Sequence, residues 1–254
     1  MTADLFSGLT GRTDDAETLA ALEADYTPPA VAVQCLLGLQ ATLHDLGVVF
    51  APRRALDPAA GSGCWGRAMR AVLGPSVGLV GAEPRATEAA NLASYDAGLT
   101  MDFAALLRTG MPPFDLVITN PPFSAFEPAN FWPLQLLESG LLHSGSVVAL
   151  LGLSSWGQSE GAAATLRAWS PALQLRLGGR PAFRADGQTD AREYSVWVWS
   201  TADGRLRPMG ARPFWRTVQL PTLPTGLRRW SPSAVPGTYP IDPELVAEIR
   251  GRYL

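Results

Sequence analysis

The stretch Leu56-Asp57-Pro58-Ala59-Ala60-Gly61-Ser62-Gly63 decides the fold, because it places an acid and a glycine-rich turn directly after a short strand predicted over residues 54–57. The two glycines let the backbone approach a ligand closely, and the helix predicted from about Trp65 offers free N–H groups at its start. The turn lacks the Gly-Lys-Ser/Thr ending of a Walker A loop, and Gly66 is misplaced for a GxGxxG dinucleotide fingerprint. An acid at the strand end instead suits a cationic ligand.

Acidic residues also follow the next two predicted strands. Residues 77–83 are predicted as a strand that ends in Glu83, 26 residues after Asp57. That spacing is typical of a carboxylate that reaches ribose hydroxyls in a βαβ unit. Residues 101–103 are predicted as the end of a third strand, which carries Asp102 and an aromatic ring. Because the carboxyl ends of parallel strands share one sheet edge, the three acids predict a ligand crevice there.

A second motif follows the apolar run Phe114–Ile118, which predicts a buried parallel strand. The sequence Asn120-Pro121-Pro122-Phe123 ends that strand, since proline cannot donate a hydrogen bond to a sheet ladder. An amide, a proline carbonyl and an aromatic ring are therefore gathered at the edge where ligands bind in open α/β sheets. By itself this segment is more often a simple turn, but the upstream glycine loop favours a functional site.

Together the two motifs resemble those of S-adenosylmethionine (SAM)-dependent amino-methyltransferases, chiefly the N6-adenine DNA methyltransferases of phages and bacteria. The segment Tyr26-Thr27-Pro28-Pro29 resembles the family's Tyr-x-Thr-Pro motif, shortened by one residue. The resemblance covers about residues 26–199. It implies a Rossmann-like class I methyltransferase fold: a mostly parallel seven-stranded sheet with an antiparallel C-terminal strand and helices on both faces.

The resemblance also implies an enzyme that transfers a methyl group from SAM to the exocyclic N6 amine of adenine in DNA. Asn120 and Pro121 would accept hydrogen bonds from that amine, and Phe123 would stack on the base. The implied catalytic residues are Asn120, Pro121, Pro122 and Phe123. The implied cofactor residues are Tyr26, Thr27, Pro28, Asp57, Pro58, Ala59, Gly61, Gly63, Glu83, Pro84, Asp102 and Phe103. Among them, Thr27 would hold the methionine part, Glu83 the ribose and Asp102 the adenine.

Charge is distributed unevenly along the chain, which contains no lysine. Residues 1–127 hold 7 arginines and 14 acids, whereas residues 128–254 hold 13 arginines and 9 acids. Arginine binds phosphate bidentately, so this asymmetry favours an anionic partner such as DNA. A polar linker over residues 179–190 resembles an active-site loop of the family. The candidate phosphate-binding residues are Arg180, Arg184, Arg212, Arg216, Arg228 and Arg229.

The composition of the chain indicates how it divides into domains and in which cellular compartment it works. We expect a methyltransferase domain over residues 1–200, with helices and the YTPP motif within residues 1–45, and a Pro- and Arg-rich extension over residues 201–254 with a final helix at 243–250. Two cysteines and two histidines without ligand spacing predict no metal site and fit a reducing cytoplasm. The family resemblance implies that this is the cytoplasm of a bacterial or phage-infected cell. No apolar run reaches the length of a membrane span, and the acidic N-terminus is unlike a signal peptide.

The sequence indicates the substrate less specifically than it indicates the cofactor. Only 55 residues follow Trp199, and no insert of the size of a target-recognition region is evident, so recognition is expected to be short, absent or delegated to a separate specificity subunit. NPPF also resembles ribosomal RNA methyltransferases, whereas protein-glutamine methyltransferases characteristically have Tyr in the fourth position. RNA and protein amino-methyltransferases are therefore alternatives, as is a non-catalytic module that binds SAM or nucleic acid.

Overall fold

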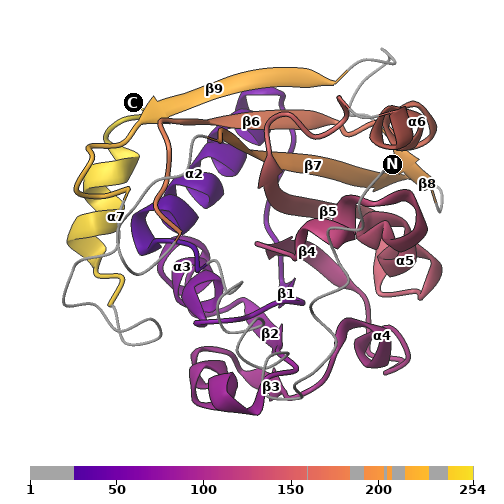
Figure 1. Ribbon diagram of the computed structural model, residues 1–254. Coiled ribbons are helices and arrows are strands. Elements are labelled where there is room, and N and C mark those ends of the chain that lie inside the picture. Colours follow the sequence, from indigo (N-terminus) through magenta and orange to yellow (C-terminus); the bar gives the residue numbers. More distant parts are fainter. Residues whose placement is uncertain are drawn as a thin grey trace, which may run out of the picture.

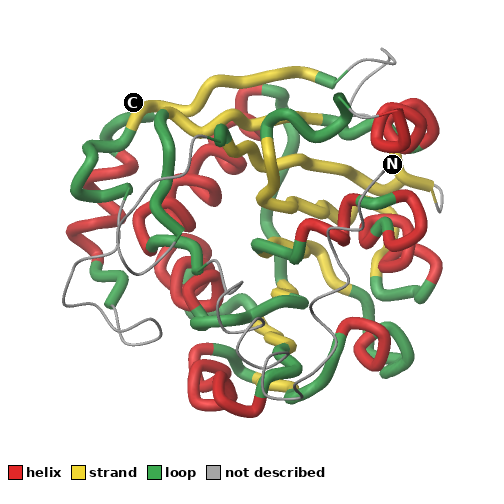
Figure 2. Tube along the Cα trace, viewed as in Figure 1, coloured by secondary structure: helices red, strands yellow, loops and turns green. Residues whose placement is uncertain are grey.

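The computed structural model describes residues 26–158, 160–183, 192–202, 205–207, 215–228 and 240–253 (Figures 1 and 2). The strands are β1 (Arg54–Asp57), β2 (Gly78–Ala82), β3 (Ala97–Leu99), β4 (Phe114–Thr119), β5 (Leu142–Leu153), β6 (Leu173–Gly178), β7 (Tyr194–Ala202), β8 (Arg205–Arg207) and β9 (Arg216–Thr222). The α-helices are α2 (Pro29–Asp45), α3 (Cys64–Leu73), α4 (Phe103–Leu106), α5 (Trp132–Glu138), α6 (Glu160–Ala168) and α7 (Pro243–Arg250). Three 3₁₀ helices are η1 (Ala86–Ser94), η2 (Phe123–Phe126) and η3 (Pro128–Asn130).

One sheet runs through the molecule in the order β3-β2-β1-β4-β5-β7-β6-β9, with β8 paired to β7. Strands β1 to β5 pair in parallel, while β7 is antiparallel to both of its neighbours β5 and β6. This is the predicted mostly parallel sheet with an antiparallel C-terminal strand. The strands β8 and β9 extend it beyond the expected seven and come from the C-terminal extension, for which only the final helix was predicted.

Helices cover both faces of the sheet, because its central strands are apolar on both sides. In Figure 1, α2, α3 and α7 lie on one face, and α4, α5 and α6 lie on the other. On β5, Val147 and Ala149 belong to the first layer and Val148 and Leu150 to the second, as the period of two in a strand requires. The second layer is rich in aromatic side chains: Phe126, Phe131, Trp132, Trp197 and Trp199.

Helix α2 begins at the second proline of the YTPP motif and is one of the helices expected within residues 1–45. Pro29 occupies its first turn, where the missing N–H costs no hydrogen bond. Thirteen of its 17 residues are buried, which is more than one face of a helix. The extra burial comes from the extension, since the Gln34 side chain donates to the Pro221 carbonyl of β9 and Tyr253 donates to the Gln34 carbonyl at 2.9 Å.

The predicted third strand was misplaced. Strand β3 ends at Leu99, and Asp102 is the N-cap of the short helix α4, where its carboxylate accepts the Ala105 N–H at 2.7 Å. Segment 101–103 lacks the alternation of a strand, and an acid before a small apolar run is a helix-start pattern. The 3₁₀ helix η1 connects β2 to β3. Residues 1–25, where a further helix is expected, lie outside the described residues.

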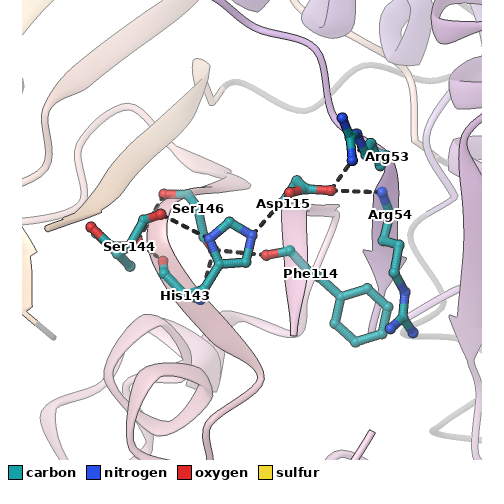
Figure 3. A network of polar contacts seen from close by, with 8 residues as sticks. Arg53, Arg54, Phe114, Asp115, His143, Ser144 and Ser146 are labelled. Carbon is teal, nitrogen blue, oxygen red and sulfur yellow. Dashed lines mark hydrogen bonds and ion pairs between the residues drawn. The ribbon is translucent and has the colours of Figure 1, made fainter. Parts of the chain in front are cut away.

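A polar network at the amino end of the parallel strands joins β1, β4 and β5 (Figure 3). The Asp115 carboxylate accepts the N–H groups of Arg53 and Arg54, each at 2.8 Å, and lies 2.9 Å from Nε2 of His143. The other ring nitrogen of His143 lies 2.8 Å from the Ser144 carbonyl. These contacts fix the relative positions of the three strands at the sheet edge opposite the candidate site.

Candidate functional site

The glycine loop between β1 and α3 has the conformation that its sequence predicts. Gly61 and Gly63 adopt φ of 48° and 69°, the left-handed region that favours glycine. A Cβ atom on Gly63 would lie 2.5 Å from the Asn91 carbonyl oxygen, so no other residue fits there without displacement of the backbone. The loop therefore lets a ligand approach its backbone closely at the start of α3, although the N–H groups of Ala60, Gly61 and Gly63 already donate within the protein.

Asp57, at the end of β1, is fully buried and shapes this loop from below. Its carboxylate accepts the Ala59 N–H at 3.3 Å and the Tyr95 hydroxyl. Burial raises the pKa of Asp57 to about 6, although hydrogen bonds to the carboxylate partly offset that rise. Its direct contacts are therefore with the protein, and they fix the shape of the loop above it.

Tyr95 is a site residue that the sequence analysis missed. Its hydroxyl donates to Asp57 and accepts the Gly66 N–H at 3.1 Å, so it ties β1 to the first turn of α3. Cβ atoms on Gly66 and Gly81 would each lie 2.6 Å from the Tyr95 ring. These two glycines, which fit no dinucleotide fingerprint, were the available signal that a large side chain packs beneath the loop.

Glu83 follows β2 and lies against the glycine loop. Its carboxylate is 3% exposed and accepts the Gly61 N–H at 2.9 Å. Arg85 donates to the same carboxylate through its own N–H, through Nε at 2.6 Å and through Nη2 at 3.2 Å. Burial alone would raise the pKa of Glu83, but the donors from Arg85 and Gly61 outweigh it and hold that pKa below its usual value. Pro84, between the two, is exposed.

The YTPP segment lies beside this loop. The Tyr26 hydroxyl donates to Glu88 of η1, and its N–H donates to the Phe183 carbonyl at 3.1 Å. Burial and the Glu88 carboxylate together raise the pKa of Tyr26 to about 12. Thr27 is 3% exposed, and within the described part of the chain its hydroxyl oxygen has no hydrogen-bond partner. An unsatisfied buried hydroxyl next to an open loop is a group that a ligand can satisfy.

Asp102 and Phe103 also lie beyond the carboxyl end of the sheet. The Asp102 side chain is exposed and accepts one helix-cap hydrogen bond, which leaves its other oxygen available. The Phe103 ring stacks on Trp132 with centroids 3.8 Å apart and an interplanar angle of 11°. One face of this ring is thus already packed, so Phe103 can offer a ligand its other face or its edge.

The NPPF segment follows β4, the sheet neighbour of β1. Leu56 of β1 pairs with Val117 of β4 in a parallel register. The chain therefore leaves these two neighbouring strands at the same edge of the sheet, at Asp57 in one case and at Asn120 in the other. Pro121 is buried, whereas Phe123 opens η2 with 47% of its surface exposed. Beside it is an apolar cavity of about 170 Å³, lined by Phe123, Phe126, Leu153, Ser155, Trp156 and Gly157. The Trp156 indole donates to the Phe126 carbonyl at 3.2 Å, which fixes this wall.

The candidate phosphate-binding arginines have different settings. Arg180 and Arg216 are exposed. Arg228 is half-buried, and its guanidinium donates to the carbonyls of Leu223 and Arg180 at 2.9 and 3.3 Å and to the Thr225 hydroxyl at 3.1 Å. Arg184, Arg212 and Arg229 lie outside the described residues. Within the described part of the chain, no cluster of three or more His, Cys, Asp or Glu side chains could hold a metal ion, and no helix is long and apolar enough to cross a membrane.

Solved structures with the same architecture define the fold. The chain is similar to a protein described as a class I SAM-dependent methyltransferase from Listeria monocytogenes, with 15% identity over 94% of this chain and 78% of that one and a TM-score of 0.55. It is also similar to the methyltransferase subunit of a type I restriction-modification system from Streptococcus thermophilus. That likeness has 16% identity, covers 94% of this chain and 56% of the other, and has a TM-score of 0.54.

These likenesses show that the chain has the class I SAM-dependent methyltransferase fold, which confirms the predicted fold class. No protein-family model matches the sequence, and the search of curated proteins finds no match.

Proposed function

We propose that this protein is a SAM-dependent methyltransferase that methylates the N6 amine of adenine in DNA. The observation that carries the proposal is the position of NPPF. It leaves β4 at the same sheet edge as the glycine loop after the neighbouring β1, and an apolar cavity lies beside Phe123. This arrangement supports a site for a methyl donor next to a site for a planar acceptor, in a fold shared with class I methyltransferases.

The described residues fit SAM. Gly61 and Gly63 form a cradle that a Cβ on Gly63 would fill, and the unsatisfied Thr27 hydroxyl offers a polar contact to the methionine part. Glu83 is buried beside Gly61 as an ionised carboxylate, the group that ribose hydroxyls and a nearby cation favour. When bound, SAM supplies an electrophilic methyl group on a sulfonium.

The acceptor needs help because the lone pair of an exocyclic adenine amine is delocalised into the ring. Hydrogen bonds from its two N–H groups to the Asn120 side-chain oxygen and the Pro121 carbonyl favour a pyramidal nitrogen with a localised lone pair. Both acceptors are neutral, and an amide does not become protonated and stop accepting. The remaining contribution of the protein is orientation of the amine toward the methyl group. No strong base is required before attack.

A nucleobase suits the cavity better than a flexible side chain does. Its walls are aromatic and aliphatic, and the exposed Phe123 ring can stack on a base, which is worth about 1–3 kcal/mol. Extrusion of a base from a duplex costs a few kcal/mol. Phosphate contacts from exposed arginines, such as Arg180 and Arg216, supply the rest of the binding energy.

The test is incubation of the purified protein with SAM labelled in the methyl group and with DNA, RNA or a protein extract in separate reactions. Nucleoside analysis of the DNA should find labelled N6-methyladenine, and the Asn120→Ala variant should form it more slowly by about 100-fold or more. Label in RNA or protein alone would replace DNA by that substrate class. Binding of SAM with no transfer to any of the three would support the non-catalytic module instead.

A further inference from the structure

The Arg85 side chain occupies the position beside the Glu83 carboxylate where a bound ligand is expected. Its guanidinium donates to both oxygens of the Glu83 carboxylate, and a Cβ built on Gly61 would lie 3.7 Å from its Nη2 atom. The side chain therefore bridges the end of β2 and the glycine loop after β1. In the proposed function, these are the two elements between which SAM binds.

The hydrogen-bond capacity of Glu83 is used up. An ionised carboxylate offers about four lone-pair sites. Four donors fill them, namely the N–H groups of Gly61 and Arg85 and the Nε and Nη2 groups of Arg85. Two ribose hydroxyls can bind this carboxylate only if donors leave it. The two backbone donors are held by the chain, whereas the guanidinium is on a flexible side chain that is 30% exposed.

We propose that the guanidinium of Arg85 competes with the ribose hydroxyls of SAM for the Glu83 carboxylate, so that Arg85 sets how tightly the cofactor binds. This inference rests on the proposed function for the identity of the cofactor. The chain provides a second position for the displaced guanidinium. The Tyr26 ring lies 5.9 Å from it, and the charge of Glu88 already acts on it.

The competition predicts that removal of the guanidinium strengthens binding. The apparent affinity of a site falls in proportion to the fraction of molecules in which the site is available. The Arg85–Glu83 ion pair is partly exposed, and competition from a pair of this kind weakens the affinity for a ligand by about two- to five-fold. Arg85→Met should therefore bind S-adenosylhomocysteine about two- to five-fold more tightly than the wild type, as measured by titration calorimetry.

The matched control is Arg70→Met. Arg70 has a similar exposure, pairs with Asp96 at 2.7 Å and lies away from the glycine loop, so its removal should leave the affinity unchanged. The 2′,3′-dideoxy analogue of S-adenosylhomocysteine provides a second control, because it has no hydroxyls to compete. It should bind the wild type and Arg85→Met equally.

A measurement on the wild type protects the test against a variant that does not fold. The NMR signal of the Arg85 Nε–H group should shift when S-adenosylhomocysteine is added and should not shift with the dideoxy analogue. Equal or weaker binding by a folded Arg85→Met, or an Arg85 signal that does not respond, would overturn this inference alone. Absence of any binding by the wild type and the variants would overturn the proposed cofactor together with it.

Discussion

At the scale of single residues, Asn120 and Phe123 are expected to affect different kinetic constants. Asn120→Ala removes an acceptor that acts on the reacting amine, so kcat should fall about 100-fold or more while SAM affinity stays near that of the wild type. Asn120→Asp keeps an acceptor oxygen and should retain partial activity. Phe123→Ala should raise KM for DNA by the equivalent of about 1–3 kcal/mol, and Phe123→Trp by less. Full turnover by Asn120→Ala would show that NPPF is only a turn.

The buried Asp57 carboxylate makes the stability of the folded protein depend on pH, and Asp57→Asn removes this dependence. Its pKa is near 6 in the folded protein because of burial, but about 3.9 when unfolded. The folded state therefore binds more protons between these values, and stability is lost as the pH rises from about 4 through 6. Urea denaturation should show wild-type stability falling by about 2–3 kcal/mol relative to Asp57→Asn between pH 4 and 7. A stability difference that is constant with pH would contradict this assignment.

At the scale of secondary-structure elements, His143 and Asp115 join β5 to β4 and β1 at the far edge of the sheet (Figure 3). The Ser144 carbonyl and the Asp115 carboxylate raise the pKa of His143. Each accepts a hydrogen bond from one ring nitrogen, and only the charged imidazolium can donate from both nitrogens at once. Burial would raise the pKa of Asp115, but the N–H groups of Arg54 and Arg53 and the His143 ring together lower it.

The stabilisation from this pair should therefore have a defined pH window. The His143 contribution is complete below about pH 6.5 and is lost as the pH rises through its raised pKa, whereas the Asp115 contribution is complete above about pH 4 and is lost on further acidification. His143→Gln should thus destabilise most between about pH 4 and 6.5, by about 0.5 kcal/mol, because both side chains are partly exposed. His44→Gln, at a 91% exposed side chain, is the control. An equal loss at pH 9 would refute the charge argument.

At the scale of the whole molecule, the C-terminal extension holds the segment that leads to the predicted active-site loop. The Arg228 guanidinium binds the Arg180 carbonyl, and the Arg228 carbonyl accepts the Ala182 N–H at 2.9 Å. The next residue, Phe183, accepts the N–H of Tyr26 and so connects this segment to the YTPP motif. Hydrogen bonds thus connect the extension, through residues 180–183, to the YTPP motif.

Arg228 and Arg216 should therefore respond differently to mutation. Arg228→Ala should lower the free energy of unfolding by about 1–2 kcal/mol, because it leaves main-chain carbonyls without their donor. Arg216→Ala, at an exposed position of β9, should not change stability, but should reduce the slope of log affinity for DNA against log salt by about one. Unchanged stability and a reduced salt slope for Arg228→Ala would instead support its predicted phosphate contact.

The sequence by itself determined the elements that local patterns define. The bounds of β1 and α7 agree with prediction, and the strand before NPPF is one residue longer than predicted. Glycine, proline and apolar periodicity act within a few residues, so these features are legible along the chain. The same patterns indicated the glycine loop, Glu83 and NPPF at one sheet edge.

Only the tertiary structure decided what these residues contact. Tyr95 beneath Asp57, Arg85 on Glu83 and Arg228 on the Arg180 carbonyl each join parts of the chain that no local pattern relates. Strand β9 has weak alternation and a proline at position 221, and it becomes a strand by pairing with the edge of β6 and covering α2. Burial and hydrogen-bond partners depend on such distant contacts, and they set the charge state of Asp57 and the availability of Glu83 to a ligand.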